Sequence, residues 1–332
     1  MSHIVLFDPA LQDNNGVLSS NLGDCIISES TNLYLREIFG TDIEIYRYST
    51  HTPLSLKLLK NLKHSDYCFV GGSNLLSSKI SNYNQWKLFS NPSFFNYFYP
   101  NLSKLILFGV GWWQYQENPN FLTSRFYGKI FNGDFVHSVR DNYTLNKLKK
   151  IGISNIINTS CPTTWNLNGR SADRLDTKPK NVILTLTDYS QNVELDNKLI
   201  NILLKYYNNL FFFPQGKSDL LYLNSLDIYK KNKNKFTILN ENVLSLDIFT
   251  SDSDVDFIGT RLHGGIKCLQ KNIQTLIIGI DNRANEIHKD INLPVVNRND
   301  LMKIEQWING NSSNGKISIN QEAINIWKNQ FQ

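Results

Sequence analysis

The sequence contains few residues of the kinds that mark secreted, zinc-binding or membrane-spanning proteins. Its four cysteines, Cys25, Cys68, Cys161 and Cys268, are far apart and form no Cys-x-x-Cys pair, so neither a disulfide framework nor a zinc site is indicated. No apolar run is as long as the roughly 18 residues that a membrane-spanning helix needs, and the first residues include no basic segment of the kind that begins a signal peptide. We therefore expect a cytoplasmic protein with ordinary buried thiols, no metal and no cofactor.

The sequence also has little excess of positive over negative charge. The net charge is only +5 over 332 residues, and no basic stripe suggests a nucleic-acid partner. The run "KKNKNK" at 230–235 is typical of a solvated helix end; the alternative is peripheral contact with anionic lipid at the inner membrane surface. The hydrophobic content of 41% is that of a folded protein, and the length predicts two domains.

Short β-rich runs alternate with amphipathic helical runs through both halves of the chain. The expected strands cover 3–7, 43–46, 67–72, 104–111, 135–139, 155–158, 182–187, 210–216, 235–239, 255–259 and 273–280. Strands that are almost wholly apolar and alternate with helices predict parallel sheets covered on both faces. The pattern is interrupted by a polar stretch, so we expect domains at 1–165 and 181–332 and a linker at about 166–180.

Chemically distinctive residues follow the expected strand at 255–259. Arg261 and His263 come next, and then Gly264 and Gly265, before an expected helix at 264–271. The glycines would let a ligand approach the first backbone N–H groups of that helix. Arginine supplies a forked positive charge and histidine exchanges a proton near neutral pH. This predicts an anion site; for an isolated Arg-x-His pair, the alternative is a capping histidine beside a surface arginine.

Other strand ends carry related groups. Arg140 follows the strand at 135–139, with Asp141 as the expected N-cap of the next helix, and Arg283 follows the strand at 273–280. Two turns rich in glycine and asparagine, at 19–27 and 70–76, also come after expected strands. Since ligands of open α/β sheets bind at the carboxyl ends of the strands, we expect one cleft to collect these groups.

These residues together resemble the polysaccharide pyruvyl transferase family. The resemblance spans about 20–290 and rests on six stretches: "NLGD" (21–24), "GGSNLL" (71–76), "GVG" (109–111), the Arg-Asp pair that opens "RDNYTLNKLKKIG" (140–152), and "RLHGGI" (261–266) followed by "IDNR" (280–283). It implies two Rossmann-like α/β domains that face each other across a cleft, as in GT-B glycosyltransferases. It also implies a cytoplasmic enzyme of exopolysaccharide or cell-wall polysaccharide biosynthesis.

The reaction implied by the resemblance moves a pyruvyl group from phosphoenolpyruvate, a co-substrate, onto two hydroxyls of a glycan or lipid-linked glycan precursor as a cyclic ketal. The match makes His263 the general acid. The residues implied for donor binding are Arg140, Arg261, Leu262, Gly264 and Arg283. The turns that we expect to face the cleft or the sugar acceptor contribute Asn21, Gly23, Asp24, Gly72, Ser73, Asn74, Trp112 and Trp113. Aromatic faces suit the apolar face of a sugar, and core packing is the alternative for the tryptophans.

The chain departs from the family pattern in three places. Ser73 stands where the family often has a third glycine, and the late turn ends in Arg283 where the family usually has lysine, which keeps the charge and changes its geometry. Cys161 replaces a family aspartate before Pro162, and without a paired base we expect a buried thiol rather than a nucleophile. The Asp-x-Asp-x-Asp run at 252–256 is expected to be a solvated turn rather than a metal site.

Two other functions are compatible with the sequence. A GT-B glycosyltransferase could use Arg140 and Arg261 to hold the diphosphate of a nucleotide sugar, although such an enzyme should show an acidic ribose or base contact in its second domain. A catalytically silent glycan-binding protein should have lost His263 or its arginines, and this chain retains them.

Overall fold

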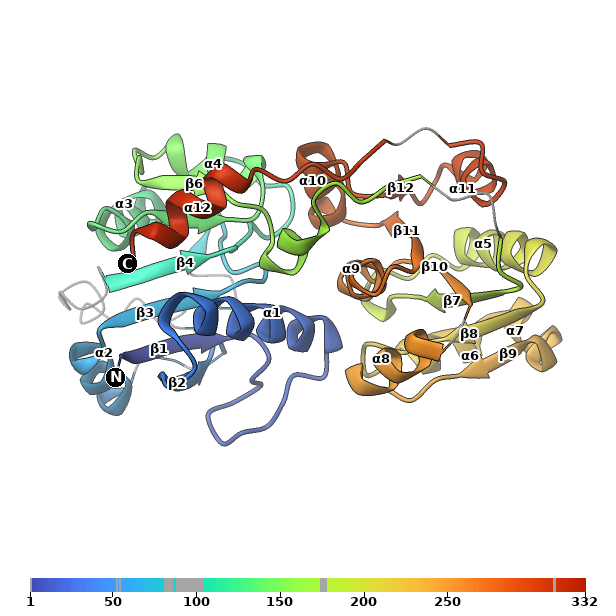
Figure 1. The fold of residues 1–332 in the computed structure, drawn as a ribbon, viewed down its shortest axis with the longest axis horizontal. Helices are drawn as coiled ribbons and strands as arrows, with labels where there is room; N and C mark the ends of the chain where they lie inside the picture. Colours follow the sequence, from blue (N-terminus) through green and yellow to red (C-terminus); the bar gives the residue numbers. More distant parts are fainter. Residues whose placement is uncertain are drawn as a thin grey trace. The chain divides into compact units, whose positions relative to one another are not determined.

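The computed structural model describes residues 2–51, 53, 55–80, 86–87, 104–173, 178–252, 254–312 and 315–332. The chain forms two compact units (Figure 1). Unit 1 contains residues 1–19, 27–165 and 320–332, and unit 2 contains residues 20–26 and 166–319. Both are α/β units built on parallel strands, which confirms the predicted fold class.

Unit 1 is built on a parallel sheet in the order β2-β1-β3-β4, with a parallel β5-β6 pair. A bridge between Val110 and Val139 connects that pair to the chain leaving β4. The strands are β1 (His3–Asp8), β2 (Glu44–Ser49), β3 (Tyr67–Gly71), β4 (Leu105–Phe108), β5 (His137–Val139) and β6 (Ile156–Asn158). The helices are α1 (Leu22–Phe39), whose first residues belong to unit 2, α2 (Leu56–His64), α3 (Phe121–Phe131), α4 (Asn142–Lys149) and α12 (Gln321–Asn329), with a 3₁₀ helix at Pro162–Leu167.

The last helix completes the core of unit 1. Trp327 of α12 is fully buried, and its ring centroid lies 4.4 Å from that of Phe108 and 6.0 Å from those of Phe69 and Trp165. Large aromatic side chains of this kind bury much apolar area and so dominate core energetics. The structure therefore assigns 320–332 to unit 1, whereas the sequence pattern placed these residues in the second domain.

Unit 2 contains a six-stranded parallel sheet in the order β12-β11-β10-β7-β8-β9. Its strands are β7 (Asn181–Thr185), β8 (Asn209–Phe212), β9 (Phe236–Ile238), β10 (Val255–Gly259), β11 (Gln274–Gly279) and β12 (Val295–Asn297). This is the strand order of a doubly wound dinucleotide-binding fold, in which the order reverses between the first and fourth strands. Here that switch point lies between β7 and β10.

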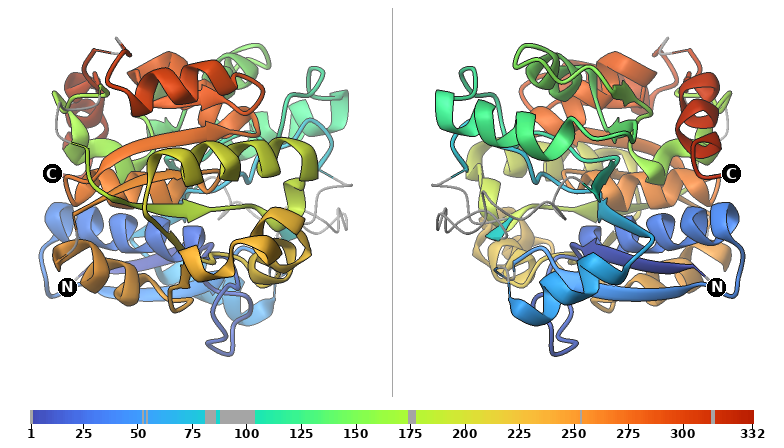
Figure 2. Two further views of the ribbon diagram at one scale, coloured as in Figure 1. Left: turned by 90° about the vertical axis from the view of Figure 1, so that its right-hand side faces the viewer. Right: turned by 90° about the vertical axis from the view of Figure 1, so that its left-hand side faces the viewer.

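Helices cover both faces of this sheet (Figure 2). They are α5 (Val193–Tyr206), α6 (Asp219–Ser225), α7 (Asp227–Lys231), α8 (Val243–Asp252), α9 (Leu262–Gln270), α10 (Asn282–Ile291) and α11 (Leu301–Ile308). Alternate residues of β7 face opposite cores: Val182 and Leu184 pack with α5, α6 and α11, while Ile183 packs with α8 and α9. Burial on both faces explains why the strands are apolar throughout.

Unit 2 also contains a short segment from early in the chain. The backbone N–H of Leu22 donates to the carbonyl of Gln215 at 2.9 Å, and the Leu22 side chain packs against the core of α8 and α9. Residues 20–26 are therefore part of unit 2, although the sequence pattern placed them in the first domain. In the described part of the chain, no helix has the length and apolar character needed to cross a membrane.

Candidate functional site

The carboxyl ends of β7 and β10 bring the "RLHGG" segment to the switch point of unit 2. Arg261 is the N-cap of α9, and its backbone N–H donates to Oγ1 of Thr185 at 3.2 Å. The Thr260 and Thr187 hydroxyls are 2.8 Å apart. Because ligands of doubly wound sheets bind where the strand order reverses, this is the part of unit 2 where a binding site is expected.

Arg261 is buried and held by two aspartates. Its Nε donates to Asp219 at 3.0 Å, and its Nη2 donates to Asp219 and, at 3.0 Å, to Asp188. Asp219, fully buried, also accepts from the backbone N–H groups of Gln215 and Gly216, each at 2.9 Å. The alternative of a surface arginine is thus wrong, and the guanidinium is already paired with carboxylates on its Nε and Nη2 side.

His263 lies in the first turn of α9, since this helix begins at Leu262 rather than at 264 as the sequence pattern indicated. The side chain is 6% exposed. It packs beside the "NLGD" turn, because a β-carbon on Gly23 would lie 3.3 Å from Nδ1 of His263. Asn21, Gly23 and Asp24 are therefore gathered with His263 in one unit, although they are about 240 residues apart in the chain.

The two glycines after His263 pack closely against neighbouring side chains. A β-carbon on Gly264 would lie 1.9 Å from Nε2 of Gln215, so the Gln215 amide occupies that space. A β-carbon on Gly265 would lie 2.5 Å from Cγ1 of Ile277 and 3.0 Å from Cε1 of Phe257. Both glycines are therefore required by packing: at Gly264 the Gln215 amide lies against the backbone, and at Gly265 the helix approaches the sheet directly.

Replacing Gly265 with alanine is expected to destabilise the protein by about 1–3 kcal/mol, because the added methyl overpacks the core between α9 and the strands. The free energy of unfolding in urea measures the effect. Gly128→Ala is the matched control, since Gly128 is also helical and the nearest atom to its added β-carbon is 3.8 Å away. Equal stabilities of the two variants would contradict the packing role of Gly265.

Arg283 lies in the first turn of α10, where its Nε donates to the N-cap Asp281 at 2.9 Å and its Nη2 donates to the hydroxyl of Tyr189. The Tyr189 ring is 60% exposed and also lies 5.2 Å from Cζ of Arg261. Burial works against the charged form of Arg283, but Asp281 and Tyr189 outweigh it and raise the pKa of the guanidinium. Arg283 thus stays a cation whose charge is shared with Asp281.

Unit 1 holds Arg140 in a close-fitting cradle. Arg140 is 1% exposed, its Nε donates to Asp141 at 3.2 Å and its Nη2 donates to Oδ1 of Asn74 at 2.8 Å. A β-carbon on Gly111 would lie 2.1 Å from Nη2, so only glycine fits there. Nη1 of Arg140 is buried and has no hydrogen-bond partner within the described residues. Asp141 caps α4 as predicted, accepting from the Thr144 N–H at 2.7 Å.

The Gly-rich turn after β3 contributes Asn74 to this cradle. Ser73 has a φ of +67° and Gly72 a φ of +48°, the left-handed region that glycine adopts most easily. The conformation at Ser73 explains why the family often has glycine at this position. Gly72 also has no room for a side chain, because a β-carbon there would lie 2.3 Å from Cγ2 of Ile27.

The tryptophans expected to face an acceptor differ from each other. Trp112 is fully buried in the core of unit 1, with its ring nitrogen bonded to Oε1 of Gln116 at 3.0 Å, so it cannot present a face to a sugar. Trp113 is half-buried. Trp86 is 2% exposed, and most of the aromatic stretch that follows it lies outside the described residues. Cys161 is buried as expected, and burial raises the pKa of its thiol; Cys25 is only half-buried.

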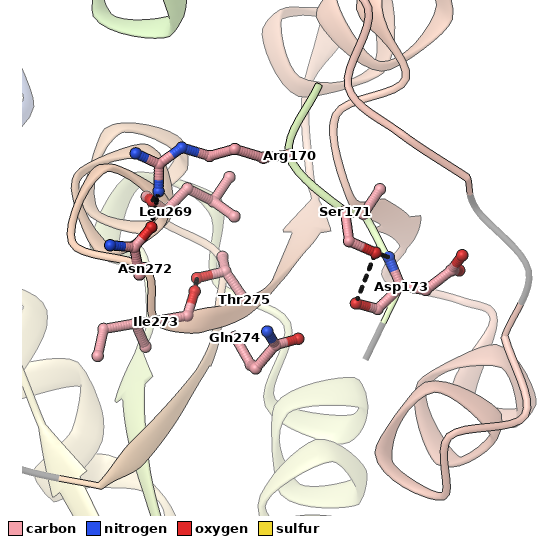
Figure 3. Close-up of a pocket in the computed structure, with 9 residues that line it drawn as sticks. Arg170, Ser171, Asp173, Leu269, Asn272, Ile273, Gln274 and Thr275 are labelled. Atoms are coloured by element: carbon pink, nitrogen blue, oxygen red, sulfur yellow. Dashed lines mark hydrogen bonds between the residues drawn. The ribbon is translucent and has the colours of Figure 1, made fainter. Parts of the chain in front are cut away.

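A separate pocket of about 230 Å³ lies in unit 2 (Figure 3). It is lined by residues of the 170–173 segment and by residues from the end of α9 to the start of β11. Arg170 donates to the carbonyl of Leu269 at 2.7 Å there and so caps the C-terminal end of α9. Since the pocket lies at the amino end of β11, it is at the opposite edge of the sheet from His263.

Sequence reasoning missed four residues of the unit 2 site: Asp188, Tyr189, Gln215 and Asp219. They follow β7 and β8, so their position after apolar strands was the available signal. Among the described residues, no group of three or more His, Cys, Asp or Glu side chains is arranged to hold a metal ion.

Two of the solved structures that match nearly the whole chain show what the fold is similar to. The UDP-GlcNAc 2-epimerase of Methanocaldococcus jannaschii, solved with UDP-GlcNAc and UDP, is 13% identical, with 96% of this chain and 94% of that chain covered at a TM-score of 0.53. The MnaA protein of S. aureus, solved with UDP, is 11% identical, with 95% and 93% covered at a TM-score of 0.55. These likenesses show a GT-B-type fold, as predicted.

No curated protein sequence matches the chain. The sequence model described as polysaccharide pyruvyl transferase matches residues 21–282, a range that contains the "NLGD" turn, the Arg140 cradle and the His263 helix. With most of its length matched by that model, the chain belongs to the polysaccharide pyruvyl transferase family, a family of transferases.

Proposed function

We propose that the protein transfers the pyruvyl group of phosphoenolpyruvate to two hydroxyls of a glycan or lipid-linked glycan precursor, with His263 as general acid. The observation that carries this proposal is the position of His263, in the first turn of α9 and beside Arg261, at the switch point of a chain of this family. A helix N-terminus favours negative charge. Phosphoenolpyruvate carries both a carboxylate and a phosphate.

In the proposed reaction His263 donates a proton to the methylene carbon of the donor, and positive charge develops at the central carbon. A sugar hydroxyl adds to that carbon and loses its proton, and the bond to the phosphate oxygen breaks. A second hydroxyl then adds, loses its proton and closes the ketal, so inorganic phosphate and the ketal are the products. Of the two protons that the hydroxyls release, one replaces the proton donated by His263 and the other leaves with the phosphate.

Arginine N–H groups that form no hydrogen bond within the described residues support the binding of phosphoenolpyruvate. Among the described residues, Arg261 bonds its aspartates through Nε and Nη2, which leaves Nη1 as the nitrogen for a ligand. We also assign donor binding to Arg140, whose buried Nη1 lacks a partner among the described residues. Placing a charge-bearing ligand oxygen against such a group would satisfy a buried polar atom that otherwise costs free energy.

A thermal-shift screen tests the proposed donor. Phosphoenolpyruvate at 100 times its Kd is expected to stabilise the protein by about 2.7 kcal/mol, following RT ln(1 + [L]/Kd). UDP-GlcNAc and other nucleotide sugars are the comparison ligands, since the two similar structures were solved with UDP-containing ligands. Stabilisation by a nucleotide sugar and not by phosphoenolpyruvate would overturn the proposal in favour of a glycosyltransferase or epimerase activity.

A further inference from the structure

The Gln215 side chain has an unexplained hydrogen-bond donor at the start of α9. Gln215 is 1% exposed, and its Nε2 has no hydrogen-bond partner within the described residues. The same atom occupies the space where a side chain on Gly264 would lie. A buried polar group without a partner is rare enough in folded proteins to require a reason. A ligand that the amide contacts would supply one.

The backbone of Gln215 is fixed from both sides. Its N–H donates to Asp219 at 2.9 Å, and its carbonyl accepts from the N–H of Leu22 in the "NLGD" turn at 2.9 Å. Asp219 in turn is held by Arg261. The amide is therefore preorganised, because the segments that carry it are bonded to the site's arginine and to the turn beside His263.

The electrostatics of the site give a role to an uncharged hydrogen-bond donor such as the Gln215 amide. Arg261 is paired with Asp188 and Asp219, and Arg283 is paired with Asp281, so much of the arginine charge is already compensated. The first N–H groups of a helix have no intrahelical acceptor, and the Arg261 side chain makes no capping hydrogen bond to them. An anion at this helix end would be met by α9 backbone N–H groups and by the Gln215 amide.

We propose that Gln215 is an anion-contacting residue: its Nε2 donates to a carboxylate or phosphate oxygen bound at the N-terminus of α9. The identity of the ligand as phosphoenolpyruvate rests on the proposed function. Its negative charge is inferred from the site itself. It also explains Gly264, since any larger residue at that position would push the amide out of the ligand's reach.

The test is Gln215→Glu, which keeps the size of the side chain and replaces the donor with a negative charge. Isothermal titration with phosphoenolpyruvate, UDP and inorganic phosphate is expected to show at least about tenfold weaker binding of whichever anion binds the wild type, the effect of losing a hydrogen bond to a charged group. The thermal midpoint without ligand is expected to fall, because the new carboxylate is buried near Asp219 without a cation of its own, so binding is measured under conditions where the variant is shown to be folded. Gln306→Glu, on exposed residue 306 of α11, is the control for the added charge and should leave affinity within about twofold.

Unchanged affinity in a folded Gln215→Glu protein would overturn the inference, because it would mean that the Gln215 side chain only fills the space beside Gly264. Gly264→Ala is the second variant: its methyl displaces the amide without changing charge, and it should weaken anion binding in the same direction. If the wild type binds UDP but not phosphoenolpyruvate and Gln215→Glu weakens UDP, the inference stands and the proposed function fails. If the wild type binds none of the three anions, both fail.

Discussion

Replacing His263 with glutamine is expected to lower kcat by a factor of about 100 or more, while donor affinity and the thermal midpoint stay close to those of the wild type. The loss in rate follows from removing the group that protonates the donor's methylene carbon. The stability is expected to hold because glutamine is similar in size and can still form hydrogen bonds at the start of α9. Steady-state kinetics together with donor titration separate the two effects.

Solvent deuterium gives a chemical signature of the same step. In deuterated water the wild type should incorporate deuterium into the methyl group of the ketal, since any route that protonates that carbon must do so. The His263→Gln variant should form the same labelled product far more slowly. A folded variant that retains turnover within about threefold of wild type would show that the proton comes from another group or from water. A capping role for His263 would instead lower activity and stability together.

Replacing Arg261 with alanine is expected to destabilise unit 2 by about 3–5 kcal/mol, because it leaves a buried carboxylate without its cation. Asp219 is fully buried and Asp188 is half-buried. This effect is larger than the loss of one ligand contact, so donor binding by this variant must be measured under conditions where it is shown to be folded. Urea unfolding of the free protein gives the stability.

The double variant Arg261→Ala, Asp219→Asn is the control for that result. With both charges removed, part of the lost stability should return, since the amide oxygen of asparagine still accepts from the N–H of Gln215 or Gly216. A single Arg261→Ala loss below about 1 kcal/mol would show that the ion pair contributes little, as exposed pairs do. The Arg261 guanidinium could then exchange its aspartate partners for a ligand at little cost.

The alternation of apolar strands with helices was enough to predict the parallel sheets, because burial on both faces leaves a direct record in the sequence. It was also enough to place Arg140, His263 and Arg283 after strands. The strand-to-helix position of His263 was predicted to within one turn. Short helices such as α6 were missed, since seven residues carry too little periodicity to identify.

The partners of Arg261 could not be predicted from the sequence. Asp188 and Asp219 lie 73 and 42 residues away from it, and their carboxylates look like any others that follow a strand. Trp112 was expected near a sugar because nothing local distinguishes a buried tryptophan from an exposed one. Its burial depends on residues such as Tyr127, which lies on α3. Pairings over such distances follow from topology, which periodicity does not encode.

The return of α12 to unit 1 sets an order in which the protein can be made. During synthesis, residues up to 319 emerge first, and they include all the described strands of both units. Unit 2 can then close, whereas unit 1 still lacks Trp327 and its neighbours against Phe69 and Phe108. The half that begins the chain is thus the last to finish folding, contrary to the usual N-terminal-first order of multidomain chains. Until residues 320–332 arrive, Phe69 and Phe108 lack the aromatic neighbour that α12 supplies.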